Sequence, residues 1–355
     1  MRTTTTLSAS VLAAATAFGQ EKPVDTPHDM EHMQHSSEHG GFMQGGMHHA
    51  LAKGVKLEQK IDGQTITLRI GPITLPVHTS HMTMPQPPDL EWQIPVDGWL
   101  LAYTPKLVDS DGNSVPGIVL HHTAFWNENR ADFLCPNKEE HIFGAGGEMT
   151  PWMQIPGYGY RVQMGDKIRI ETMVHNPTAT TYDKVFLEVA IPYQDARGET
   201  GAAPKSVYPA WMDVNSCGSS GYDLPAGKSE KTGTVAVKYN GVLLGVGGHM
   251  HDYGKQVVLE DTTQKATVAA LDAIVDEQGH LLAMPVESFF DVGGYQFAAG
   301  DVLKISATYD NTTGKMLRDG AMGIVVGYFV PADDAAMAGL RREKKRDVAG
   351  MSKDR

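Results

Sequence analysis

Two histidines separated by a single residue, His249 and His251, form a pair with clear chemical potential. On an extended segment, side chains at i and i+2 point from the same face, so both imidazoles can reach one metal ion. The Val-, Leu- and Gly-rich residues 235–246 predict a β-strand that ends at this pair. Met322 is the candidate third ligand, and the alternative is that it is an ordinary core methionine. Because a thioether favours Cu(I) and imidazole accepts either oxidation state of copper, this donor set predicts a copper site.

A second group of histidines lies in the first half of the chain, where His121 and His122 are adjacent. Neighbouring residues on a regular strand point to opposite faces, so this pair can share a metal ion only where the strand ends or bulges. The pair therefore predicts an irregularity, unless one ring simply packs inward and the other meets solvent. His175 follows another predicted strand and completes a potential three-imidazole site. His78 and His81 lie in a Pro-rich connection, and we expect them to be exposed loop residues outside the site.

The composition restricts the class of protein. A chain of 355 residues with 41% hydrophobic residues can form about two domains with real cores. The formal net charge of -12 and the lack of a basic stripe argue against nucleic-acid binding and favour small-molecule chemistry. The 38 Gly and 20 Pro separate short runs rich in Val, Ile, Thr and Tyr, which is typical of an all-β protein.

The strand-like pattern divides the chain into segments. A first β-domain is expected over residues 54–193, beginning with a hairpin that turns at Asp62-Gly63. A polar passage, 194–230, is expected to be a linker, and a second β-domain follows over 231–331. The tail, 332–355, is expected to be a solvated helix or a frayed end. The glycine-rich residues 143–148 lack the spacing of a dinucleotide-binding motif and are interpreted as a loop.

The N-terminal residues indicate export. Residues 1–19 have the charged start, short apolar run and small residues of a signal peptide, so the protein is expected to be secreted or periplasmic, without stable membrane insertion. Residues 20–53 are expected to be disordered, and the six His and four Met within 21–50 suit copper capture, a generic Zn- or Ni-binding tract, or a drifting linker. Cys135 and Cys217 could form a disulfide in an oxidising compartment or remain two separate buried thiols.

The two donor sets also occur in a recognisable order. His-His, then His, then His-x-His, then Met, spread over residues 54–331, resembles the type II copper, ascorbate-dependent monooxygenases, the family of peptidylglycine α-hydroxylating monooxygenase and dopamine β-monooxygenase. The resemblance implies two antiparallel jelly-roll β-sandwich domains separated by a solvent-filled cleft, with one copper ion on each, two per chain. It also implies that the His121/His122/His175 copper stores and delivers an electron. The His249/His251/Met322 copper would then be the catalytic one, where O2 binds and a substrate C–H bond is attacked.

The chain departs from that family around the second donor set. Gly247 stands where peptide-hydroxylating members have an Arg that anchors a carboxylate, and Ile324 and Val326 stand where they have Asn and Tyr. Met173 also replaces a polar group two residues before His175. These changes predict an apolar cleft that does not select peptides. The expected function is an exported monooxygenase that hydroxylates a small organic substrate with O2 and an ascorbate-like external reductant; the alternative is a copper storage or delivery protein without turnover. A substrate pocket beside the second donor set would distinguish the two.

Overall fold

The structure is a computed structural model that describes residues 50–198 and 202–342. These residues fold mainly into antiparallel β-strands, which confirms the all-β prediction. The expected signal peptide, the His- and Met-rich residues up to 49 and the last part of the tail lie outside the described residues. Within the described ranges, no helix is long and apolar enough to cross a membrane.

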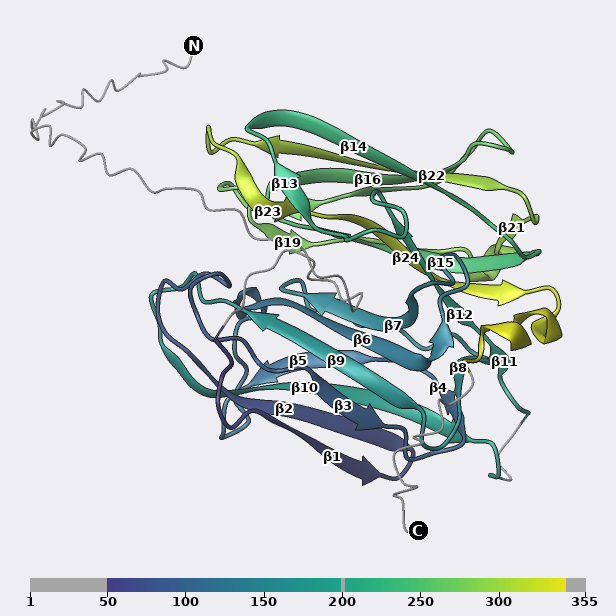
Figure 1. Cartoon of the computed structure of the whole chain (residues 1–355), viewed down its shortest axis with the longest axis horizontal. Helices are drawn as coiled ribbons and strands as arrows, with labels where there is room; N and C mark the ends of the chain where they lie inside the picture. Colours follow the sequence, from purple (N-terminus) through teal and green to yellow (C-terminus); the bar gives the residue numbers. More distant parts are fainter. Residues whose placement is uncertain (1–49, 199–201, 343–355) are drawn as a thin grey trace, which may run out of the picture. The chain divides into compact units, whose positions relative to one another are not determined.

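The first half of the chain forms two sheets, shown in purple to teal in Figure 1. The larger sheet has the order β1-β2-β10-β4-β8-β11, with β5 also paired to β10. Its strands are β1 (Lys56–Asp62), β2 (Thr65–Leu75), β10 (Tyr182–Asp195), β4 (Gly98–Leu100), β8 (Tyr158–Val162), β11 (Lys205–Ser206) and β5 (Thr104–Val108). The smaller sheet has the order β3 (Leu90–Gln93), β9 (Lys167–Val174), β6 (Leu120–Ala131) and β7 (Glu139–Gly146). Strands β1 and β2 pair up to Asp62 and Thr65, which confirms the predicted hairpin.

The second half also forms two main sheets, in green to yellow in Figure 1. One contains β12 (Tyr208–Asp213), β24 (Gly323–Pro331), β15 (Gly241–Met250), β20 (Val286–Ser288) and β21 (Tyr295–Phe297). The other has the order β14 (Gly227–Ala236), β22 (Val302–Asn311), β16 (Gly254–Asp261) and β17 (Ala266–Asp272). Two short pairs complete it: β13 (Tyr222–Leu224) with β23 (Leu317–Ala321), and β18 (Ile274–Val275) with β19 (Leu281–Ala283).

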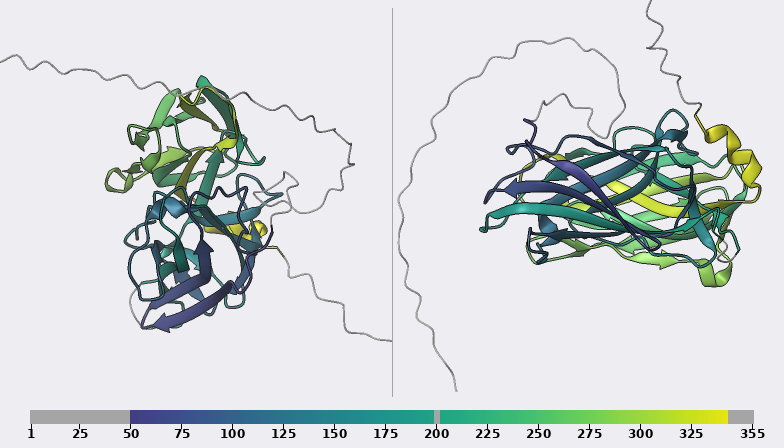
Figure 2. Two further views of the ribbon diagram at one scale, coloured as in Figure 1. Left: turned by 90° about the vertical axis from the view of Figure 1, so that its left-hand side faces the viewer. Right: turned by 90° about the horizontal axis from the view of Figure 1, so that it is seen from below.

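Each half has an apolar core, to which the other half adds a few residues, such as Leu244 in the first core and Phe133 in the second. In the first half, Ile66, Leu68 and Ile70 on β2 face Phe125 and Ile170 of the smaller sheet in one buried cluster. In the second half, β14 alternates between more and less exposed residues along its whole length, as a strand covering one side of a sandwich should. The two further views show the strands of each half running in a common direction (Figure 2), as in aligned sheet packing. The jelly-roll connectivity stays a prediction.

Several local expectations differ from the structure. The segment 194–230 contains β11, β12, β13 and the start of β14, because its polar residues form turns while the apolar run at Tyr208–Asp213 pairs with β24. The glycine-rich residues 143–146 belong to β7 and not to a loop. The tail forms the short 3-10 helix η3 (Asp334–Leu340), whose Met337 and Leu340 are buried, so this part is packed and not solvated.

A disulfide joins Cys135, after β6, to Cys217, after β12. The bond settles the alternatives that the sequence left open, and it links two positions 82 residues apart. Both cysteines pack with the core of the second half, so the chain leaving β6 is tied to that core.

Candidate metal centre

Histidine rings from both halves of the chain gather in one cluster. The ring of His121 lies 5.0 Å from His122, 5.3 Å from His175 and 5.1 Å from His251, measured between centroids. His249 and His251 are 5.7 Å apart, so the His-x-His pair projects to one side as expected. The structure therefore brings five of the six proposed ligands into contact, although the resemblance implied two separate sites across a solvent-filled cleft.

The backbone explains how two adjacent histidines reach the same place. Strand β6 is preceded by the short 3-10 helix η1 (Gly117–Val119), and its pairing with β9 shifts register between Leu120 and His122. This is the irregularity that the sequence predicted. His175 follows the last residue of β9, and its Nε2 donates to the Ile118 carbonyl oxygen at 2.7 Å, so its Nδ1 is the nitrogen left to bind a metal ion.

The Nδ1 atoms of His121 and His122 lie 2.9 Å apart. Two nitrogen ligands at about 2.0–2.1 Å from one metal ion and about 90° apart are separated by roughly 2.9 Å, so this spacing fits two ligands of one ion. The Nε2 of His251 is buried and has no hydrogen-bond partner in the described part of the chain. Buried polar atoms usually have a partner, and a bound metal ion would supply one here. The donor atoms therefore fit copper. Among the described residues, however, no three His, Cys, Asp or Glu side chains already converge as a complete metal site.

The environment keeps these rings neutral. Burial lowers the pKa of His122 to about 3, and the neighbouring His249 adds to the effect. Burial also lowers the pKa of His121 and of His251 well below the ordinary value, with further lowering by the adjacent imidazoles. The neutral imidazole is the form that binds a metal ion, so the cluster is prepared for ligation at neutral pH.

A carboxylate supports His249. Its Nδ1 lies 3.2 Å from the Oε1 of Glu148, and the backbone N–H of Gly146 donates to the same oxygen at 3.1 Å. Burial alone would raise the pKa of Glu148, but His249 and these hydrogen bonds lower it. A Cβ on Gly146 would lie 2.5 Å from the Glu148 carboxylate, so a glycine is needed for this close approach. The pair fixes the ring and directs Nε2 of His249 outward as the metal-binding nitrogen.

Met322 is connected to the His-x-His pair through Tyr309. Met322 is buried and lies between β23 and β24. The hydroxyl of Tyr309, on β22, accepts the backbone N–H of His251 at 3.0 Å and that of Met322 at 3.1 Å, and it donates to the Met322 carbonyl oxygen. One side chain thus fixes the backbone of two proposed ligands that lie far apart in sequence.

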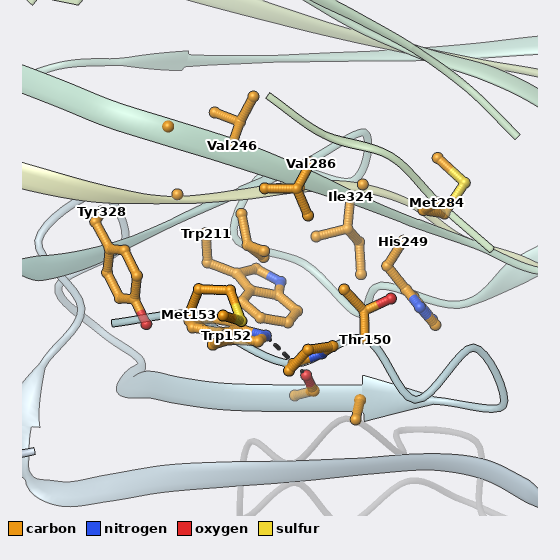
Figure 3. Close-up of a pocket in the computed structure, with 18 of the residues that line it drawn as sticks. Thr150, Trp152, Met153, Trp211, Val246, His249, Met284, Val286, Ile324 and Tyr328 are labelled. Carbon is orange, nitrogen blue, oxygen red and sulfur yellow. Dashed lines mark hydrogen bonds between the residues drawn. The ribbon is translucent and has the colours of Figure 1, made fainter. Parts of the chain in front are cut away.

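A cavity of about 340 Å³ adjoins this cluster. Its lining includes His122, His249 and Met322 at the proposed centre, together with side chains from β6, β7, β12, β15 and β24. Figure 3 shows His249 at one end of the labelled lining residues and Tyr328 at the other, with Trp152 and Trp211 between them. A pocket of the kind expected to distinguish catalysis from copper storage therefore lies beside the second donor set.

Two curated proteins are similar to this chain over part of its length. The chain resembles proteins named as copper-dependent oxygenases. It is 27% identical over 242 residues to "Probable copper-dependent oxygenase M1" of Phoma sp. and 26% identical over 242 residues to "Probable copper-dependent oxygenase clz3" of Cochliobolus lunatus. Each match covers 60% of this chain, but only 58% of the first relative and 72% of the second. This similarity supports a relationship to copper oxygenases and no narrower family.

Other comparisons add little. No family model matches the sequence. The match to the solved structure of the STIV MCP covers 78% of this chain and 95% of that protein, with 9% identity and a TM-score of 0.34. The match to the atomic structure of the Sulfolobus Turreted Icosahedral Virus has a TM-score of 0.33. Likenesses at this level carry no argument about fold or function.

Three residues of the site were missed or misplaced by the sequence analysis. His81, expected in an exposed loop, lies 4.3 Å from His121 between ring centroids, and this corrects the expectation. Glu148 was interpreted as part of a glycine-rich loop, and Tyr309 carried no motif. The Pro-rich connection gave no sign of folding back, and the contacts of the other two join residues 101 and 58 positions apart.

Proposed function

We propose that the protein is an exported copper-dependent monooxygenase that hydroxylates a small organic substrate with O2 and an ascorbate-like reductant. The observation that carries this proposal is the contact between His121 and His251, from different halves, beside a cavity lined by His249 and Met322. The names of the two relatives support copper-dependent oxygenation.

Two copper ions per chain would be held by the two donor sets. His121, His122 and His175 form the three-imidazole set, and His249, His251 and Met322 form the softer set, which favours Cu(I). When bound, copper supplies the one-electron redox chemistry by which O2 is activated toward a C–H bond. We assign the catalytic role to the softer set because two of its three proposed ligands, His249 and Met322, line the cavity, compared with one of the three-imidazole set, His122.

The chain's own residues have separate tasks in this proposal. Glu148 orients His249 and holds a proton on Nδ1, leaving Nε2 for the metal. Tyr309 fixes the backbone at His251 and Met322. The cavity walls offer a substrate mainly apolar contact beside His249 and Met322.

The cavity favours catalysis over copper storage or delivery, since storage needs the donors alone. Export is supported by the signal-peptide pattern of residues 1–19. The Cys135–Cys217 disulfide agrees with an oxidising compartment.

Oxygen uptake by the copper-loaded protein with ascorbate tests the proposal. We expect uptake that His249→Ala abolishes. His280→Ala is the matched control, because His280 bonds to Asp276 outside the cluster and should keep full uptake. Equal uptake by both variants, or none in the unmutated protein, would refute the assignment.

A further inference from the structure

The cavity walls carry no positive charge: among the described residues that line the cavity, there is no Lys or Arg. The walls are mainly aromatic and aliphatic, as Trp152, Met153, Trp211, Val286 and Tyr328 illustrate in Figure 3. A carboxylate or phosphate placed here would lose hydration without gaining a cationic partner, which is unfavourable in an apolar site. Anionic ligands are therefore disfavoured.

The two carboxylates of the lining do not favour a cation either. Glu148 already bonds to His249 and to the Gly146 N–H, so a ligand cation would have to displace the support of a proposed metal ligand. Glu287 is exposed on β20 and remains in contact with water, where an ion pair contributes little. The remaining wall offers mostly apolar contact.

The indole and phenol groups of the lining differ in their hydrogen-bond partners. The Trp211 indole N–H is buried without a partner among the described residues, and Figure 3 places this side chain between the two ends of the lining. The Trp152 indole N–H donates to the Gly144 carbonyl oxygen at 3.1 Å, drawn as a dashed line in Figure 3, so it is already satisfied. The Tyr328 hydroxyl has no hydrogen-bond partner among the described residues, and Figure 3 places this side chain at the far end of the lining from His249. Burial raises the pKa of Tyr328, so its hydroxyl stays protonated and can donate.

We propose that this cavity binds a neutral, largely apolar small molecule that has a hydrogen-bonding oxygen at the Tyr328 end. Its volume of about 340 Å³ falls in the usual range of small-molecule sites. The orientation follows from the two ends: the oxygen meets Tyr328, and the opposite, apolar end lies next to His249 and Met322. That this apolar end supplies the C–H bond to be hydroxylated rests on the proposed function.

Calorimetric titration of the full-length, metal-free protein tests the class of ligand without requiring turnover. Three probes of similar size differ in charge: 2-naphthol, 2-naphthoate and 2-naphthylmethylammonium. We expect 2-naphthol to bind at least tenfold more tightly than either ion. Equal or tighter binding of an ion, or no binding of 2-naphthol, would overturn the proposal.

Variants locate the binding in this cavity. Val286 is 60% exposed at the cavity lining, so Val286→Lys should fold and should shift the preference toward 2-naphthoate by about tenfold. Val292 is 81% exposed and outside the lining, so Val292→Lys is the matched control and should change nothing. Tyr328→Phe should weaken the binding of 2-naphthol and leave the binding of naphthalene unchanged. Identical behaviour of the two lysine variants, or equal loss of both probes in Tyr328→Phe, would contradict the assigned site and orientation.

Failure here is separate from failure of the proposed function. A protein that binds copper and consumes O2 but prefers 2-naphthoate would keep the oxygenase assignment and lose the ligand class. A protein that binds 2-naphthol but no copper would keep the ligand class and lose the oxygenase assignment.

Discussion

The rings of His121 and His251 lie 5.1 Å apart between centroids, although one belongs to the first half of the chain and the other to the second. Because the two donor sets adjoin, a ligand lost from one set changes the surroundings of the other. Copper binding by the two sets is therefore expected to be coupled. The losses of copper-binding free energy caused by substituting one ligand in each half should then not add up in a double variant.

Met322→Leu should distinguish a ligand from a core residue. The substitution keeps the side-chain volume, so stability should change by less than about 1.5 kcal/mol, while loss of the thioether should weaken Cu(I) binding. Met337, which is 2% exposed in the core of the second half, provides the matched control Met337→Leu. Cu(I) titration and thermal unfolding of both variants measure the two effects. If the Met322 variant kept the Cu(I) affinity of the control, Met322 would be a core residue only.

Tyr309→Phe should show whether one hydroxyl positions two ligands. The change leaves two backbone N–H groups without their acceptor, and we expect a loss of roughly 2 to 5 kcal/mol of stability. A weaker second copper site, with an altered Cu(II) electron paramagnetic resonance spectrum, should accompany it. Tyr222→Phe is the control, since the Tyr222 hydroxyl is buried without a partner in the described ranges. An unchanged copper spectrum in the Tyr309 variant would leave Tyr309 with a structural role alone.

The sequence predicted the parts of this protein that depend on local chemistry. Alternating residues and the Asp62-Gly63 turn gave the first hairpin, and the adjacent His121 and His122 gave the strand irregularity. The parts that were missed depend on distant contacts. Glu148 follows β7 and His249 lies on β15, and only the folding of the chain brings the two side chains together.

The same limit applies to element boundaries and to how the donor sets lie together. Residues 194–230 are rich in turn formers, and that composition hid β12, which is stabilised by pairing with β24. Nothing in the local sequence fixes the approach of His121 to His251, because it depends on packing between strands of the two halves.

Asp132 should give the fold a measurable pH dependence. It accepts the backbone N–H groups of Leu134 and Cys135, and burial raises its pKa from 3.8 to about 6 despite them. The folded state therefore holds this proton more tightly than the unfolded chain does. The protonated Asp132 contributes its full stabilisation of the fold below about pH 4, and this stabilisation is lost as the pH rises to about 6.

Asp132→Asn keeps an acceptor oxygen and removes the titration. The difference in unfolding free energy between this variant and the unmutated protein should change by about 2 kcal/mol between pH 4 and pH 6.5, in favour of the variant at the higher pH. Urea denaturation of the metal-free proteins across this range measures it. A constant difference would show that Asp132 does not carry the shifted proton.

Copper titration against a chromophoric chelator tests the central claim most directly, with His121→Ala and His251→Ala combined in a double-mutant cycle and His280→Ala as the control. We expect each ligand variant to weaken the copper held by its own donor set and also the copper held by the adjoining set. The double variant should lose less than the sum of the two, and His280→Ala should match the unmutated protein. Full tight copper binding in the double variant, or strictly additive losses, would contradict two adjoining donor sets that are coupled through the contact between His121 and His251.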